Sequence, residues 1–192
     1  SWLKVKLPTH ENFFYVSHLV QDKDLNTICK SAKCPNIAEC WSHKTATFLI
    51  LGNTCTRSCS FCSVAKGIPA SLANQEPEKT AEAVAAMGLR YAVITSVTRD
   101  DLPDGGAHHF VKTIEAVRRR TPDVRLEILI PDFQGNEDAL RTVLAAKPDI
   151  VNHNIEVPVN IYPLINRPVA NYSRSLWVLE KSKEFGATTK SG

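Results

Sequence analysis

The six cysteines of this chain all lie between positions 29 and 62, and no other position carries one. They form two triplets, which are Cys29, Cys34 and Cys40, and Cys55, Cys59 and Cys62. A four-iron cluster normally takes four protein thiolates, so a triplet leaves one iron open to bind another molecule. Two triplets therefore predict two iron–sulfur clusters and, with them, redox chemistry.

The composition is that of an ordinary globular protein. Hydrophobic residues make up 43% of the 192 positions and charged residues 22%, which is enough for one domain with a proper core. A net charge of +3 is too small to indicate a nucleic-acid partner. Because the sequence contains neither a long apolar stretch nor a signal-peptide pattern, we expect no membrane partner.

The same features predict a cytoplasmic protein, or one of an organelle matrix if a transit peptide was removed. In such a reducing compartment, cysteines serve metal binding or catalysis more often than disulfides.

From position 47 onward, apolar runs alternate with amphipathic stretches. The pattern predicts strands at 47–51, 91–97, 125–130 and 149–155, the start of a fifth at 188–190, and helices at 78–87, 108–120, 136–147 and 173–185. This alternation indicates an α/β fold with a parallel sheet. A closed eight-stranded barrel usually needs about 250 residues, so we expect a partial (β/α) barrel with its helices outside and its C-terminal part missing.

Residues 1–45 show no clear periodicity, and their apolar anchors are Trp2, Phe13, Phe14, Tyr15 and Trp41. We interpret this stretch as an irregular N-terminal extension that carries the first cysteine triplet and lies over the barrel portion, residues 46–192.

The second triplet belongs to the octapeptide Cys55-Thr-Arg-Ser-Cys-Ser-Phe-Cys62, which follows the first predicted strand directly. That position is the carboxyl edge of a parallel sheet, where active sites lie. The spacing lets a compact loop direct three thiolates at one cluster. Structural zinc is the alternative, in a non-catalytic metal-binding module, with His43 as a possible fourth ligand.

This octapeptide resembles the cluster-binding loop of the radical S-adenosylmethionine (SAM) enzymes, with Phe61 at the family's aromatic position. The resemblance implies that the open iron of a [4Fe-4S] cluster binds the amine and carboxylate of SAM. Reductive cleavage of SAM then yields a 5′-deoxyadenosyl radical that abstracts a hydrogen atom from the substrate.

The first triplet narrows the resemblance, because its spacing is similar to the auxiliary-cluster motif of the lipoyl synthases. Further similar stretches run along nearly the whole chain, at positions 2–8, 45–52, 95–106, 130–133, 151–154 and 165–168, the last together with Tyr172, Ser175 and Leu176. The family's Arg-Ser-Ser-Tyr motif, whose serine ligates the auxiliary cluster, is absent, so we expect this chain alone to be inactive.

The resemblance implies a sulfurtransferase of lipoate biosynthesis. It would insert two sulfur atoms at C6 and C8 of an octanoyl group attached to a lysine of a lipoyl carrier domain, either 2-oxoacid dehydrogenase E2 or glycine cleavage H protein. Two [4Fe-4S] clusters and SAM are the implied cofactors, and ferredoxin or flavodoxin is the implied type of electron donor. Another radical SAM enzyme with a second cluster is the alternative.

Several polar residues are candidates for contacts with SAM or the substrate. Ser96 and Arg99 follow the second predicted strand, where a plain turn is equally compatible with the sequence. Glu127 is a charge in an apolar strand, so it needs either a ligand or a structural Lys or Arg.

Strand alternation places Asn152, Asn154 and Glu156 on one side of the fourth strand, and we expect the two asparagines to line the cavity. We interpret His153 as a structural histidine. Arg167 fits the SAM carboxylate, the carrier domain or a surface salt bridge.

Overall fold

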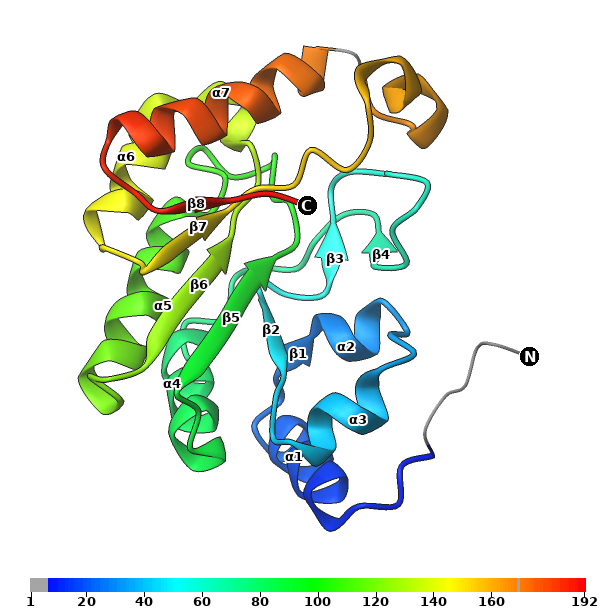
Figure 1. Cartoon of the computed structure of the whole chain (residues 1–192), viewed down its shortest axis with the longest axis vertical. Coiled ribbons are helices and arrows are strands. Elements are labelled where there is room, and N and C mark those ends of the chain that lie inside the picture. The colour runs from blue at the N-terminus through cyan, green and yellow to red at the C-terminus, as the bar shows by residue number, and fades with distance from the viewer. Residues whose placement is uncertain (1–6, 169) are drawn as a thin grey trace.

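A six-stranded sheet forms the centre of the computed structural model, which describes residues 7–168 and 170–192 (Figure 1). Its strand order is β1 (Asn26–Thr27), β2 (Thr47–Ile50), β5 (Tyr91–Ser96), β6 (Arg125–Leu129), β7 (Ile150–Asn152) and β8 (Thr189–Lys190). β1 runs antiparallel to β2, and every other neighbouring pair is parallel. Two short strands, β3 (Thr54–Cys55) and β4 (Ala65–Lys66), pair separately in the cysteine loop.

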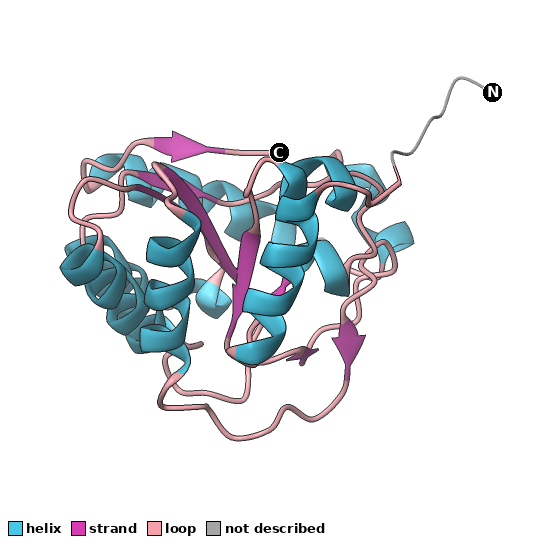
Figure 2. Cartoon of the chain, turned by 90° about the horizontal axis from the view of Figure 1, so that it is seen from below, coloured by secondary structure: helices cyan, strands magenta, loops and turns pink. Residues whose placement is uncertain are grey.

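One helix follows each of the inner parallel strands. The helices are α4 (Glu76–Met87), α5 (Ala107–Arg120), α6 (Glu137–Ala145) and α7 (Ala170–Glu184), and they pack side by side in this order. Two 3₁₀ turns, η1 (Phe133–Gly135) and η2 (Val159–Ile165), lie after β6 and β7. The helices form an outer layer and leave the opposite, concave face of the sheet open (Figure 2). This arrangement confirms the predicted partial barrel.

Local sequence signals explain where these helices begin and end. Pro77 occupies the first turn of α4, and Gly88 ends it in the left-handed region at φ +64°. The Asn136 side chain accepts a hydrogen bond from the Ala139 N–H at 3.1 Å and caps α6.

The core lies between the sheet and this helical layer. Phe48, Ile94, Leu126 and Ile128 are fully buried at alternate strand positions, and Phe110 of α5 is fully buried as well. Such alternation directs one side of each strand toward the helices and the other toward the concave face. No helix in the described part of the chain is long and apolar enough to cross a membrane.

The N-terminal region is more regular than expected. It forms α1 (Glu11–Asp22), α2 (Ile28–Ser31) and α3 (Ile37–Ser42), and β1 joins the main sheet. Phe13 of α1 packs against the fully buried Trp41, with ring centroids 5.4 Å apart. Packing against the barrel stabilises these short helices, which periodicity alone does not reveal. The boundary at residue 45 stays a prediction, and Trp2 lies outside the described residues.

The fourth parallel strand is shorter than predicted, because β7 ends at Asn152. Glu156 has a left-handed backbone with φ +72°. Asn154 and Glu156 therefore lie beyond the regular strand, where alternation no longer decides the direction of a side chain.

The core predicts a clear contrast between two leucines. Leu126→Ala removes a fully buried side chain and should lower the free energy of unfolding by about 2–5 kcal/mol. Leu164→Ala, at a side chain that is 78% exposed, should change it by less than about 0.5 kcal/mol. Urea denaturation followed by circular dichroism measures both, and equal effects would contradict the described core.

Candidate functional site

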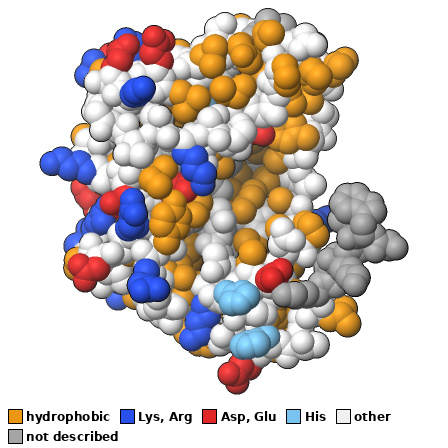
Figure 3. Space-filling view, in the orientation of Figure 1, with side chains coloured by type: hydrophobic (Ala, Val, Ile, Leu, Met, Phe, Trp, Pro, Cys, Tyr) orange, Lys and Arg blue, Asp and Glu red, His pale blue; other side chains and the backbone are white. Residues whose placement is uncertain are grey.

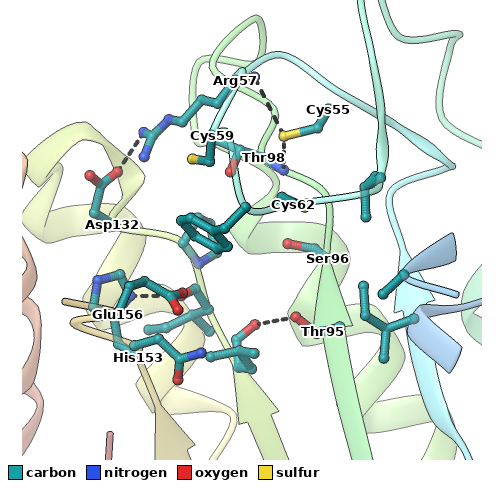
Figure 4. Close-up of a pocket in the computed structure, with 18 of the residues that line it drawn as sticks. Cys55, Arg57, Cys59, Cys62, Thr95, Ser96, Thr98, Asp132, His153 and Glu156 are labelled. Atoms are coloured by element: carbon teal, nitrogen blue, oxygen red, sulfur yellow. Dashed lines mark hydrogen bonds and ion pairs between the residues drawn. The ribbon is translucent and has the colours of Figure 1, made fainter. Parts of the chain in front are cut away.

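A cavity of about 390 Å³ opens at the carboxyl edge of the parallel strands (Figure 4). Thr95 and Ser96 of β5 and Leu129 of β6 contribute to its lining. The cysteine loop also contributes, as do His153, Asn154 and Glu156. Figure 3 shows a hollow on this face of the molecule with hydrophobic side chains inside it. The volume lies within the range of about 300–1,000 Å³ that is typical of small-molecule sites.

Cys55, Cys59 and Cys62 all line this cavity. The Cys55 sulfur accepts backbone N–H hydrogen bonds from Arg57 and Thr98, each at 3.4 Å (Figure 4). Burial raises the pKa of the Cys59 thiol, and the nearby Cys55 and Cys62 raise it further. The three thiols therefore converge on one place.

The first triplet converges separately. Cys29 lies on α2, Cys40 on α3, and Cys34 in the turn between them. Burial raises the pKa of the Cys40 thiol, with Cys29 and Cys34 as the next contributors. Ile28 and Ala32, which lie close to this triplet in the sequence, line the cavity. The first cysteine triplet therefore lies behind the wall of the same cavity.

The zinc alternative needs four ligands around a single ion. Among residues 7–168 and 170–192, no three His, Cys, Asp or Glu side chains are placed to hold a single metal ion. His43 lies with its Nδ1 atom 2.9 Å from the Glu39 carbonyl oxygen at the end of α3. A four-iron cluster is larger than one ion, so its thiolates stand farther apart than those of a zinc site.

Arg57 ties the cysteine loop to the sheet. Its guanidinium makes two hydrogen bonds to Asp100, at 2.7 and 2.8 Å, and one to Asp132 at 2.6 Å. Burial lowers the pKa of Arg57, but these two carboxylates hold it above its ordinary value. Asp100 and Asp132 follow β5 and β6, so one side chain inside the cysteine loop connects two strand ends.

Asp132 is fully buried and also accepts the Gln134 N–H at 3.1 Å. Burial raises the pKa of this carboxyl, and Arg57 more than offsets the rise, so the net pKa is lowered. The sequence analysis assigned no role to Arg57 or Asp132. The sequence feature that could have indicated this ion pair is an arginine between two cysteines, with aspartates after the strands that follow.

A second set of contacts fixes the entrance of the loop at Leu51, whose backbone is left-handed at φ +69°. Glu76 accepts the N–H groups of Leu51 at 2.7 Å and Gly52 at 3.3 Å, and His109 Nε2 lies 2.7 Å from the same carboxylate. Arg99 donates to the Leu51 carbonyl oxygen at 3.2 Å, so both sides of this residue are held.

Arg99 is buried behind the loop, and its remaining bonds go to Asp101. It does not line the cavity, so of the two alternatives that the sequence left open its contacts agree with the turn, and a contact with SAM stays a prediction. A residue at the end of a strand is often a ligand contact. Here the Arg99 guanidinium instead binds the Leu51 carbonyl oxygen and stabilises the left-handed turn at Leu51.

Four residues that the sequence offered as candidate contacts line the cavity, namely Phe61, Ser96, Asn154 and Arg167. Phe61 is half-exposed. The Ser96 hydroxyl oxygen is buried and has no hydrogen-bond partner among the described residues. A buried hydroxyl without a partner is unfavourable, so the site suits a polar ligand at this point.

Glu127 and Asn152 lie outside the cavity lining. The Glu127 carboxylate accepts hydrogen bonds from the Tyr91 hydroxyl, from Asn152 Nδ2 at 2.9 Å and from Lys190 Nζ at 3.0 Å. The sequence left open whether the partner of Glu127 is a ligand or a structural Lys or Arg, and the structure shows a lysine, Lys190. Asn152 serves this network, and its Oδ1 atom has no partner among the described residues.

His153 is buried and bound on both ring nitrogens, with Nδ1 2.8 Å from the Ile130 carbonyl oxygen and Nε2 3.0 Å from the Ser175 hydroxyl. Burial lowers the pKa of this imidazole. These contacts agree with its interpretation as a structural histidine.

Comparisons with known proteins match this arrangement. The family model of the radical SAM superfamily matches residues 49–192. The lipoyl synthase of Chlorobium chlorochromatii (strain CaD3) is 54% identical over the whole chain, which covers 66% of that relative. The lipoyl synthases of Chloroflexus aurantiacus (strain ATCC 29366 / DSM 635 / J-10-fl) and Rubrobacter xylanophilus are 50% and 52% identical over the whole chain, which covers 63% and 60% of them.

Among solved structures, methylornithine synthase (PylB) shares the fold with a TM-score of 0.56 and 13% identity, over 76% of this chain and 43% of that one. The chain belongs to the radical SAM superfamily and, within it, to the lipoyl synthase family. It spans about two thirds or less of the length of the lipoyl synthases named above.

The Leu51 turn provides a test of the loop entrance. Glu76→Gln replaces a charged acceptor of two N–H groups and should cost about 1–2 kcal/mol of local stability. The measurement is amide hydrogen exchange at Leu51 and Gly52, which should become faster. Glu78→Gln, in the same first turn but exposed, is the matched control, and unchanged exchange in Glu76→Gln would contradict the assignment.

The Arg57–Asp132 pair predicts a pH effect with a definite sign. The folded pKa of Asp132 lies below the unfolded value of about 3.9, so the ionised carboxylate stabilises the fold above that pH. This contribution disappears as the pH falls from about 4 through the lower folded value.

Asp132→Asn should therefore lose about 3 kcal/mol at neutral pH and should respond less to acid than the unchanged protein. Urea denaturation at a series of pH values measures the two curves, which should converge in acid. The exposed Asp123→Asn is the control. Parallel curves for Asp132→Asn and the unchanged protein would exclude the predicted linkage.

Proposed function

We propose that this chain carries the radical SAM machinery of a lipoyl synthase, which inserts two sulfur atoms at C6 and C8 of a protein-bound octanoyl group. The observation that carries the proposal is the convergence of Cys55, Cys59 and Cys62 on the wall of a cavity of about 390 Å³. A three-thiolate site beside an open cavity suits a cluster that must also bind a small molecule.

The residues present fit a cluster and SAM. Two thiol triplets gather separately, as two clusters require. The backbone N–H groups at Cys55 Sγ suit a thiolate that carries negative charge. The unpartnered Ser96 hydroxyl offers a hydrogen bond to a polar ligand in the cavity.

When bound, the cluster and SAM would supply a 5′-deoxyadenosyl radical, which can attack a C–H bond that has no acidic proton. The contribution of the chain is binding and orientation. Cys55, Cys59 and Cys62 would hold one cluster, while Cys29, Cys34 and Cys40 would hold the auxiliary cluster. Arg57 and Glu76 keep the cysteine loop in place, so the thiols remain convergent without large rearrangement.

The apolar part of the cavity suits an aliphatic substrate. Val64, Leu129, Ile130 and the half-exposed Phe61 line it, beside the polar groups at the strand ends. An octanoyl chain has only methylene groups and its terminal methyl group to offer at and near its reacting carbons, so it is bound by such surfaces. An octanoylated lipoyl carrier domain is therefore the proposed substrate, with ferredoxin or flavodoxin as the proposed type of donor in the cytoplasm.

Anaerobic reconstitution with iron and sulfide tests the cluster assignment. The full-length protein should bind about eight irons, and Cys59→Ala and Cys34→Ala should each lose about four of them, because each removes a ligand of a different cluster. Ser60→Ala, between two ligands, should retain them all. Iron analysis, visible absorbance and circular dichroism of each variant provide the measurements, and stoichiometric zinc without visible absorbance would contradict the assignment.

A product assay tests the reaction. Because this chain alone is expected to be inactive, the assay uses the full-length protein, and mass spectrometry of an octanoylated carrier peptide should show a lipoyl group after incubation with SAM and a reductant. Cleavage of SAM without sulfur insertion would point to another radical SAM activity.

A further inference from the structure

A second hollow, of about 370 Å³, borders the cysteine loop at Cys59. Among the described residues, Arg57, Cys59 and Arg167 are the ones that it shares with the lining of the first cavity. Its other walls come from the cysteine loop, from the turns after β5 and β6 and from the start of α7, and they include Gln134 and Arg174. Cys59 therefore lies between two hollows, and a molecule in the first cavity leaves most of the second one free.

The second hollow carries an excess of positive charge. Three arginines line it, against one carboxylate, that of Asp100. The buried Asp132 lies next to it, but this carboxylate is 2.6 Å from Arg57 Nη2 and 3.5 Å from Arg174 Nη1, so Arg57 is its closer partner. The Arg174 side chain is 32% exposed, and its charge is therefore available to a molecule outside the protein.

The rim of this hollow is both exposed and rigid. Ser58, Gln134 and Asn166 are exposed, and Ser58 directly precedes Cys59. Asn166 Nδ2 donates to Ser58 O at 2.9 Å and to Ser58 Oγ at 2.7 Å, so the end of η2 is fastened to the cysteine loop. A partner that binds this rim comes close to Cys59 and meets a surface that is already in place.

We propose that this hollow is the docking site of a small acidic electron-carrier protein, an inference that rests on the proposed function. In this step the carrier is oxidised by one electron and the cluster that Cys59 would ligate is reduced by one, while no bond forms or breaks and no proton moves. Electron transfer needs proximity rather than contact, so the carrier can remain outside the first cavity. The positive rim attracts an acidic protein and accelerates its association.

The lipoyl carrier domain is the other macromolecule that has to reach this site. It must deliver an octanoyl chain to the apolar lining of the first cavity, which Val64 and Leu129 help to form. The second hollow is lined by arginines, an aspartate and amide side chains, so its chemistry suits an acidic surface and not an aliphatic chain.

Calorimetric titration of the reconstituted, full-length protein with plant-type ferredoxin, an acidic carrier, tests this assignment. At low ionic strength, Arg174→Gln should weaken ferredoxin binding by about 3- to 10-fold, and Gln134→Lys should strengthen it by a similar factor, because the two variants change the charge of the rim in opposite directions. Both effects should shrink at high ionic strength. Lys112→Gln, at an exposed cation of α5 outside the lining, is the matched control and should bind ferredoxin normally.

The same variants separate docking from the later chemistry. With SAM and an octanoylated carrier peptide, the KM for reduced ferredoxin in 5′-deoxyadenosine formation should rise in Arg174→Gln and fall in Gln134→Lys. The rate with photoreduced 5-deazariboflavin, a small uncharged reductant, should stay the same in both, because this molecule needs no docking surface. Iron analysis and circular dichroism confirm that each variant is loaded and folded.

Unchanged ferredoxin binding in both variants would overturn the proposal, as would a failure of the unchanged protein to bind ferredoxin. An equal loss of rate with deazariboflavin in Arg174→Gln would also overturn it and make Arg174 a support of the loop through Asp132. Weaker binding of the octanoylated carrier domain, with ferredoxin binding unchanged, would assign the hollow to that domain instead. If the unchanged, full-length protein forms no 5′-deoxyadenosine with either reductant, the proposed function itself fails.

Discussion

The buried bond between Arg57 and Asp132 is the interaction on which the site depends. The three thiols of the cysteine loop repel one another once they ionise, and the loop has little regular secondary structure to hold them together. Arg57 lies between the cysteines and is held by carboxylates at two strand ends, so the rigidity of the sheet extends into the loop. Its positive charge also lowers the pKa of Cys59, although burial has the larger opposite effect.

Much of the barrel could be predicted from the sequence, because its strands and helices follow simple periodicities with clear ends, such as Pro77, Gly88 and Asn136. The N-terminal helices could not, because tertiary packing around Trp41 stabilises them rather than local propensity. The grouping of the six cysteines could be predicted from their spacing. The roles of Arg99 and Glu127 could not, since a buried charge in a sequence does not reveal whether its partner is a ligand or another residue.

The two cysteine triplets share one structural element. β2 leads from the first triplet to the second, pairs with β1 on one side and with β5 on the other, and lines the cavity through Thr47. The polar network of Tyr91, Glu127, Asn152 and Lys190 occupies the concave face of neighbouring strands. The parallel sheet therefore positions thiols at its edge and keeps its charged residues paired below them.

The distance along the chain between Cys62 and Asp132 has a consequence for biosynthesis. All six thiols are made before the two carboxylates that anchor their loop, and the later of these, Asp132, follows 70 residues after Cys62. At ordinary rates of translation, the ribosome needs about 4–14 s to reach it. Until then the cysteine loop lacks the second of its two anchors, so a fully held site for iron and sulfide forms only after the synthesis of β6.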